Sequence, residues 1–395
     1  MNAFDIGVII VAALAALGGW RIGFFSRVLS WVGLAAGLYL AVRFMPTIVT
    51  FFKVNGSVAR VALAVVVLLA AGFVGQGIGL ALGSRLHRVL PFGGARMADR
   101  AVGAALGAVG VLTAVWLLAP SLAAVPGTVS ELATGSVIAQ WVSNESHAVG
   151  LNPPNPLRSL QRLVGEDGFP QVFDEFGPSQ YTGKPPVDDP LSETVLTSAE
   201  ASTVKVFGNA CGLLQEGSGF TVAPDLVATN AHVVAGEPGG ATYVLLPNGF
   251  TKPATVVLFN PDVDLALLSV PGLGEPPLDV ATGSVGQKGA VLGHPNGQDP
   301  LAVQPAAIAN LVRAQGEDLY GTHETDRWVY VLAAQLAKGD SGAPLVDTRG
   351  QVVGIAFAIA PDRPTTSYAL ASSEFAPLLK GAGTTAVSTE SCLDE

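Results

Sequence analysis

Three residues far apart in the sequence carry side chains that together could break an acyl bond. His232 lies in the stretch TNAHVV, Asp264 in DVDLALLSV and Ser341 in KGDSGAPL. A serine hydroxyl is a weak nucleophile until a base takes its proton, and an imidazole oriented by a carboxylate is suited to that task. We therefore expect Ser341 to attack a carbonyl carbon, with His232 as the base and Asp264 as the group that orients the imidazole.

Glycines on both sides of Ser341 favour the same chemistry. Gly339 and Gly342 allow a tight turn that a substrate can approach closely. The N–H groups of Gly339 and Ser341 could then converge on one oxygen atom, as an oxyanion site requires. Taken alone, GDSG is an ordinary turn sequence, and only its combination with His232 and Asp264 favours catalysis.

The other two residues also have simpler interpretations when each is taken singly. A lone histidine is commonly a packed or surface residue, but His232 alone among the five histidines follows a strand and a turn of small residues. An aspartate next to proline commonly caps a turn, and Asp262 fits that role. Asp264 leads straight into an apolar strand, where a buried carboxylate needs a partner that the imidazole of His232 would supply.

The elements that must position these residues are predicted to be short strands. From STVKVFG to TSYALAS, β-branched and apolar runs recur between glycines and prolines without an intervening helical period. This pattern predicts antiparallel barrels or a sandwich. One helix is expected afterwards in SSEFAPLLKGAG, with Ser372 or Ser373 as its cap and Gly381 as its stop.

The first 122 residues have a different character and are predicted to lie in a membrane. Only 13% of the chain is charged and its mean hydropathy is positive, which a wholly soluble protein seldom shows. Four apolar runs can be marked, at about residues 4–20, 28–42, 61–82 and 101–122, against the ~20 residues needed to span hydrocarbon. The first five residues lack the basic start of a signal peptide, so we expect the first run to be retained.

The distribution of basic residues predicts the orientation of the four helices. The connections after the first and third runs are the more basic ones, with Arg21, Arg27, Arg85, Arg88, Arg96 and Arg100. Basic connections stay on the cytoplasmic side, so both ends of the chain are expected to face outward. Gly75, Gly79 and Gly83, and likewise Gly103 and Gly107, would allow close helix contact, although glycine is also simply common in membrane helices.

A proline-rich segment lies between the two parts of the chain. The predicted boundaries are therefore 1–122 for the membrane domain, 123–197 for the linker and 198–395 for the last domain. The linker is either a solvated tether or partly helical, with one helix in VSELATGSVIAQWV and another in LRSLQRLV. Near its end, LSETVLTSAEAS is expected to be unstructured and open to self-cleavage.

Five motifs together resemble, in order and content, the trypsin-like peptidases of the HtrA branch over roughly residues 202–379. They are GSGFTVAPDLVATNAHVV, DVDLALLSV, VLGHPNG, GDSGAPLVD and GQVVGIAFA. The four amino-terminal runs resemble the colicin V production family, and the whole chain resembles the membrane-anchored periplasmic serine proteases of actinobacteria. The resemblance implies an all-α transmembrane bundle of four helices followed by an all-β chymotrypsin-like double β-barrel.

For the site, the resemblance implies a serine endopeptidase with His232, Asp264 and Ser341 as its triad and the N–H groups of Gly339 and Ser341 as its oxyanion hole. One departure is Ala343, where the family usually has glycine.

The resemblance also places residues around the substrate. The residue six before the nucleophile, at the base of the primary pocket, is Gln335, so no carboxylate awaits a basic side chain. The matching substrate strand contains Phe357, Ala358 and Ile359. An apolar or narrowed cleft that prefers apolar side chains is therefore expected.

The expected partners follow from charge and from the resemblance. The chain carries a formal net charge of −10, and the part after the membrane runs has no stripe of Lys or Arg, which argues against nucleic acid. Peptide or protein substrates and a lipid bilayer are expected, with no metal and no cofactor. The resemblance implies a multi-pass inner-membrane protein with a periplasmic protease domain, acting in acid and oxidative stress tolerance and in processing cell-envelope proteins such as peptidoglycan hydrolases.

Two other functions remain open at this point. The barrels could be a catalytically silent sensor or binding module coupled to the membrane helices, but the complete set of triad residues argues against this. The helices could form a channel or transporter, but no charged residue lies deep inside the apolar runs.

The only two cysteines, Cys211 and Cys392, both fall on the side assigned to the oxidising exterior. They are expected to form a disulfide, the alternative being two free thiols.

Overall fold

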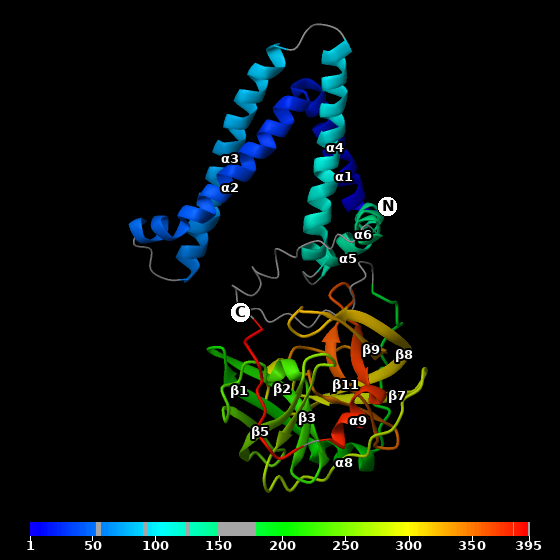
Figure 1. Ribbon diagram of the computed structural model, residues 1–395. Helices are drawn as coiled ribbons and strands as arrows, with labels where there is room; N and C mark the ends of the chain where they lie inside the picture. The colour runs from blue at the N-terminus through cyan, green and yellow to red at the C-terminus, as the bar shows by residue number, and fades with distance from the viewer. Residues whose placement is uncertain (53–56, 90–93, 124–126, 149–178, 382, 394–395) are drawn as a thin grey trace. The chain divides into compact units, whose positions relative to one another are not determined.

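The computed structural model describes residues 1–52, 57–89, 94–123, 127–148, 179–381 and 383–393 (Figure 1). These residues form two compact units. The first contains the four long helices, the last of them up to Ala119, and α6 (Val137–Ala148). The second contains α5 (Thr128–Thr134), α8 (Glu193–Ser202) and the strands that follow.

The first unit confirms the four predicted membrane helices. They are α1 (Ala3–Ile22), α2 (Phe24–Phe52), α3 (Ser57–Val89) and α4 (Gly94–Ala123). Each contains a span that is long and apolar enough to cross a membrane: Ala3–Ile22, Phe24–Ala41, Val66–Arg85 and Arg96–Pro120. The predicted runs were therefore correct in number and somewhat short in length.

Glycines let these helices approach until their backbones touch. A Cβ atom on Gly75 of α3 would lie only 2.2 Å from the carbonyl oxygen of Gly33 in α2, and one on Gly103 of α4 would lie 2.6 Å from that of Gly19 in α1. Gly79, Gly83 and Gly107 face neighbouring backbones at similarly short range. The structure thus favours the packing interpretation of these glycines over simple abundance, because any side chain there would push the helices apart.

Asp5 joins the start of α1 to the start of α6. Its carboxylate accepts hydrogen bonds from the Ser136 hydroxyl at 2.6 Å and from the Ile138 N–H at 3.1 Å, so it caps α6 as well as its own helix. The helix predicted in VSELATGSVIAQWV is consequently two helices separated at Gly135–Ser136. The predicted linker, residues 123–197, is therefore helical at its start, while LRSLQRLV lies outside the described residues.

The second unit contains two closed six-stranded barrels, which confirms the predicted double barrel (Figure 1). In the first barrel the strand order is β1-β2-β3-β6-β5-β4. Its strands are β1 (Thr203–Ala210), β2 (Leu213–Ala223), β3 (Leu226–Thr229), β4 (Thr242–Leu245), β5 (Thr251–Asn260) and β6 (Leu265–Ser269). Valines at alternate positions, such as Val204 and Val206 of β1, are fully buried in its core.

The second barrel has the order β10-β11-β12-β9-β8-β7. Its strands are β7 (Lys288–Gly293), β8 (Ala302–Glu317), β9 (Glu324–Ala333), β10 (Pro344–Asp347), β11 (Val352–Ile359) and β12 (Thr366–Ala371). The expected helix follows as α9 (Ser372–Leu379), but its N-cap is Ala371, which makes no side-chain cap, so neither Ser372 nor Ser373 has the predicted role.

The segment before β1 corrects the prediction that LSETVLTSAEAS is unstructured. It forms α8, whose N-cap Ser192 accepts a hydrogen bond from the Val195 N–H at 3.4 Å. Leu191 and Ala199 belong to a hydrophobic cluster with residues of both barrels. A side-chain cap and an apolar face against the barrels therefore order this segment.

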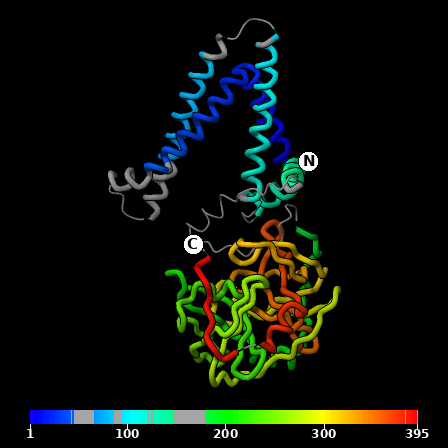
Figure 2. Tube along the Cα trace, in the orientation of Figure 1, coloured from blue at the N-terminus to red at the C-terminus, as the bar shows by residue number. Residues whose placement is uncertain are grey.

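A disulfide joins Cys211 to Cys392, with a Cα–Cα distance of 5.8 Å, as predicted. The chain around Cys392 is also hydrogen-bonded to the first barrel: the Gly236 N–H donates to the Thr389 carbonyl at 3.0 Å, and the Thr389 hydroxyl donates to the Glu237 carbonyl at 2.8 Å. Figure 2 traces this C-terminal tail in red along the green first barrel.

Replacing Cys392 by serine is expected to destabilise the barrels. The bond spans a sequence separation of 181 residues, and closing a loop of that size stabilises a fold by on the order of 5 kcal/mol in the chain-entropy model. Thermal unfolding of the full chain in detergent micelles measures the effect, with Ser391→Ala as the matched control. Equal melting temperatures for Cys392→Ser and wild type would show that the bond contributes nothing to stability.

Candidate active site

His232 and Asp264 are held together by two hydrogen bonds. The Nδ1 atom of His232 lies 2.7 Å from Asp264 Oδ2, and the backbone N–H of His232 donates to Asp264 Oδ1 at 2.9 Å. Asp264 is 1% exposed, so both carboxylate oxygens obtain a partner away from bulk water. The structure therefore brings together His232 and Asp264, as the sequence pattern predicted.

Strand pairing explains why these two residues meet. β3 pairs with β6, with Thr229 opposite Ala266, so the turn η1 (Ala231–Val233) after β3 lies beside the residues that enter β6. Asp264 has a positive φ of 58°, which is uncommon for a residue other than glycine. Such a backbone conformation persists only where its surroundings enforce it, and here it is enforced next to the imidazole.

Ser341 lies on a turn of the second barrel that packs directly on the first. Its carbonyl accepts the Ser218 N–H at 2.8 Å. A Cβ atom on Gly217 would lie 2.7 Å from Val233 and 3.0 Å from the Ser341 carbonyl oxygen, which places Ser341 close to the residue after His232. Among the described residues, the Ser341 hydroxyl and Nε2 of His232 have no hydrogen-bond partner, and the structure shows no hydrogen bond between the two. Both atoms are therefore open to a substrate.

The serine turn also leaves two backbone donors free. The N–H groups of Asp340, Gly342 and Ala343 donate to carbonyl oxygens of the protein. By contrast, those of Gly339 and Ser341 have no acceptor among the residues that the structure describes. Gly339 has φ 92° and Gly342 has φ 86°, both in the region that favours glycine. These are the two N–H groups predicted to hold an oxyanion.

The predicted substrate-binding residues occupy different environments. Gln335 is exposed, Ile359 is partly exposed, and Ala358 is buried. Phe357 is 2% exposed and packs in the core, with the Arg327 guanidinium 5.4 Å from its ring centroid. Because a bulge in β11 between Ala356 and Ala358 displaces Phe357 from the strand register, its side chain does not narrow a cleft as expected.

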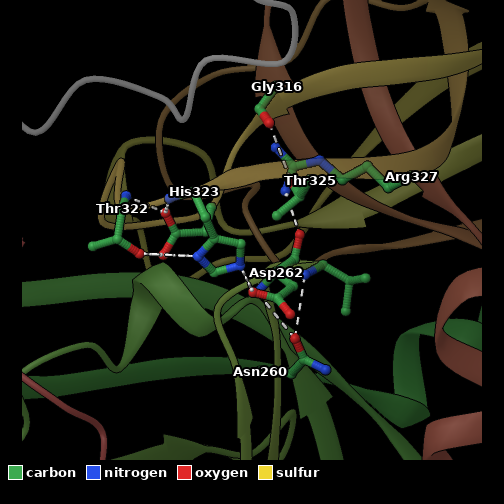
Figure 3. A network of polar contacts seen from close by, with 9 residues as sticks. Asn260, Asp262, Gly316, Thr322, His323, Thr325 and Arg327 are labelled. Atoms are coloured by element: carbon green, nitrogen blue, oxygen red, sulfur yellow. Dashed lines mark hydrogen bonds and ion pairs between the residues drawn. The ribbon is translucent and has the colours of Figure 1, made fainter.

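A polar network from the second barrel supports the turn before Asp264 (Figure 3). Asn260 caps that turn by accepting the Asp262 N–H at 3.0 Å, so Asp262 itself is not the cap. His323 Nε2 lies 3.0 Å from the Asp262 carboxylate, and Arg327 donates to the Asp262 carbonyl at 3.2 Å. Sequence reasoning missed both His323 and Arg327, because neither belongs to a motif and each acts across the barrels.

Comparison with known proteins agrees with this geometry. Residues 217–355 match the family model of the trypsin-like peptidase domain, and residues 4–147 match that of the colicin V production protein. The serine protease Rv3671c of Mycobacterium tuberculosis is 35% identical over 98% of this chain and 98% of its own length. The chain belongs to the trypsin-like serine proteases that carry a colicin V production-like membrane domain. This protease is thus a multi-pass membrane protein.

Solved structures and more distant relatives extend the comparison. The crystal structure of the Rv3671c protease in its active form is 38% identical, with a TM-score of 0.50, and covers 55% of this chain and 98% of that one. A probable periplasmic serine endoprotease, DegP-like, from Chlamydia pneumoniae is 32% identical over 36% of this chain and 28% of its own length.

A buried carboxyl group lies between the two free donors of the protease. Asp340 is 1% exposed; its Oδ2 accepts the Ala337 N–H at 2.9 Å, and its Oδ1 has no partner among the described residues. Burial raises the pKa of the Asp340 carboxyl from 3.8 to about 6, against a smaller opposite effect of the Ala337 N–H. At neutral pH the serine turn therefore contains a buried carboxylate, one oxygen of which has no hydrogen-bond donor among the described residues.

Replacing Asp340 by asparagine is expected to stabilise the protease at neutral pH. Because the folded-state pKa is raised, the contribution of the wild-type carboxyl is fully present below pH 3.8 and is lost as the pH rises through about 6. The stability gain of Asp340→Asn should thus be near zero below pH 4 and reach on the order of 3 kcal/mol by pH 8. Unfolding measured from pH 4 to 8, with the exposed Asp326→Asn as control, tests this. A gain independent of pH would contradict it.

Proposed function

We propose that this serine protease cuts peptide bonds with His232, Asp264 and Ser341 as a catalytic triad. The observation that carries the proposal is the coincidence of two features in one place. Asp264 orients the His232 ring through a 2.7 Å contact, and the adjacent serine turn presents two N–H groups without an acceptor among the described residues. A binding module that does not catalyse has no need of both.

The chemistry follows from these positions. The Ser341 oxygen attacks the peptide carbonyl carbon while His232 Nε2 takes the proton of the Ser341 hydroxyl. The resulting oxyanion accepts hydrogen bonds from the two free N–H groups. His232 then gives that proton to the leaving amine as the C–N bond breaks, which leaves an acyl group on Ser341. Water attacks this ester with His232 again as base, and the carboxylic acid product departs while Ser341 regains its proton.

The substrate is proposed to be an extended peptide or protein segment with an apolar residue at the cleaved bond. The Ala356 N–H and carbonyl are already hydrogen-bonded to Ala343 and Gly342. Beyond Ala356, β11 pairs with β12 but no longer with β10, so its backbone at residues 357–359 is where such a segment would add as a strand. Gln335 supplies no charge to attract a basic side chain, and Ile359 is partly exposed.

We further propose that the protease domain faces the periplasm from the inner membrane. The basic connections after the first and third helices support this orientation. The disulfide between Cys211 and Cys392 requires an oxidising compartment. A place in acid and oxidative stress tolerance, through processing of cell-envelope proteins such as peptidoglycan hydrolases, is proposed from the sequence resemblance.

Ser341→Ala and His232→Ala are each expected to lower peptide hydrolysis by several orders of magnitude, because the nucleophile and its base act as a unit. Peptidase assays and labelling with a fluorophosphonate probe measure this in the full chain. Ser284→Ala, an exposed serine elsewhere, serves as control. Folded wild-type protein that neither labels nor hydrolyses peptide would identify a silent module instead.

Self-cleavage is expected before α8, in the irregular and partly exposed stretch 183–190, since a protease needs a substrate segment that is accessible and free of regular structure. Val187 in this stretch is 93% exposed and apolar. Amino-terminal sequencing of fragments from purified protein should locate the cut there, and Ser341→Ala should remain whole. A cut inside α8, or identical fragments from both proteins, would count against this prediction.

A further inference from the structure

A buried lysine links the first barrel to a loop of the second. Lys205 of β1 has a side chain that is 8% exposed, and its Nζ lies 2.7 Å from the carboxylate of Glu216 in β2 and 3.0 Å from that of Asp299. It also donates to the Gly297 carbonyl. Burial lowers the pKa of Lys205, but hydrogen bonds from its ammonium to Glu216 and Asp299 outweigh that effect and raise it. The group therefore stays charged.

The loop held by Lys205, residues 294–299 between β7 and β8, has a conformation that needs support. Asn296 adopts φ 57° and ψ 27°, in the left-handed region that side chains other than glycine rarely occupy. Gly297 has φ 66°, and a Cβ atom there would lie 2.1 Å from the Glu216 carboxylate. His294 closes the loop through Nδ1, 3.1 Å from the Gln298 carbonyl.

This loop contacts the turn that carries the proposed oxyanion donors. The Asn296 N–H donates to the Lys338 carbonyl, and a Cβ atom on Gly339 would lie 2.3 Å from the His294 carbonyl oxygen. In a planar trans peptide the C=O and the following N–H point in opposite directions. Since the Lys338 C=O points to the loop, the N–H of Gly339 must point away from it.

The next peptide of the turn is held from the first barrel. The Ser218 hydroxyl donates to the Gly339 carbonyl at 2.7 Å and accepts the His294 N–H at 2.9 Å. Gly339 is therefore fixed on both sides: by the loop at its N–H side and by Ser218 at its carbonyl. Glycine alone would leave these peptides free to rotate.

We propose that Lys205 is a positioning residue for catalysis: by holding the 294–299 loop against Lys338, it keeps the Gly339 N–H directed at the developing oxyanion. The inference rests on the proposed function of Ser341 and extends it to a residue that touches no substrate. Without the ammonium, the carboxylates of Glu216 and Asp299 would face each other across the barrels and repel. The loop would then withdraw from Lys338, and the peptide before Gly339 could turn over.

The test compares Lys205→Met, Lys205→Arg and Lys252→Met in the full chain in detergent. Lys252 is the matched control, because its Nζ also donates to a backbone carbonyl of the first barrel region, that of Gly272, without touching the serine turn. Loss of one oxyanion donor lowers kcat by roughly 100-fold or more. We expect Lys205→Met to lose about this factor in kcat with KM changed little, Lys205→Arg to keep much of the activity, and Lys252→Met to equal wild type.

A second readout separates positioning from general destabilisation. A peptidyl boronic acid binds Ser341 as a tetrahedral anion and uses the oxyanion donors, whereas an uncleaved peptide bound to the Ser341→Ala background does not. Lys205→Met should weaken boronate binding by the same factor as kcat/KM and leave peptide binding unchanged. A lower melting temperature with unchanged kcat and boronate affinity would overturn the proposal.

A milder variant covers the case in which Lys205→Met does not fold. The Asp299 side chain is 75% exposed, so Asp299→Ala should fold and should lose kcat and boronate affinity in the same direction by several-fold. Wild-type values for Asp299→Ala, in the absence of folded Lys205→Met, would also overturn the role of this contact. Failure of the proposed function is distinct, since wild type and Ser341→Ala would then be equally inactive.

Discussion

A carboxylate withdrawn from water needs hydrogen-bond donors, and the proposed active site is built around the donors that Asp264 receives. Both come from His232, one from the ring and one from the backbone. With Nδ1 committed to Asp264, Nε2 is the ring nitrogen left for a serine hydroxyl. Asp264 makes this pairing from a left-handed backbone conformation, so the surrounding structure must maintain an unfavourable turn.

That turn is maintained by the other barrel, and the relation is reciprocal. Arg327 and His323 of the second barrel bind the residue two before Asp264, while Ser218 and Lys205 of the first barrel hold the serine turn and its neighbouring loop. Each barrel thus fixes a turn of its partner that carries a residue of the proposed triad. Active-site geometry is then a property of the packed pair of barrels, and any change that separates them disturbs both halves at once.

The sequence was informative where a short motif determines local structure. His232, Asp264 and Ser341 stood out because each lies in a distinctive local context, and the barrels followed from regular short strands. The contributions of His323 and Lys205 could not be predicted, since a histidine in a hairpin and a lysine in a strand acquire meaning only from partners about 60 to 90 residues away.

The same limit explains the errors. α8 was expected to be disordered because its composition is polar, yet its apolar face fits the barrels, and that fit is a tertiary property. Phe357 was expected in the cleft because it follows the pattern of a substrate strand, and a bulge turned it into the core instead. Asp5 looked like a residue at the end of an apolar run, although it caps a helix that begins more than 130 residues later.

The tail that ends in Cys392 has a consequence for the order in which the protein is made. A ribosome releases the chain from its amino terminus, so the strands of the first barrel emerge well before residues 387–392. Those late residues supply the partner of Cys211, the carbonyl for Gly236 and the hydroxyl for Glu237, all next to the turn that follows His232. The chain that follows His232 therefore lacks the disulfide and hydrogen bonds of the tail throughout synthesis of the barrels. During that interval the first barrel is held together by its own strand pairing alone, without these bonds.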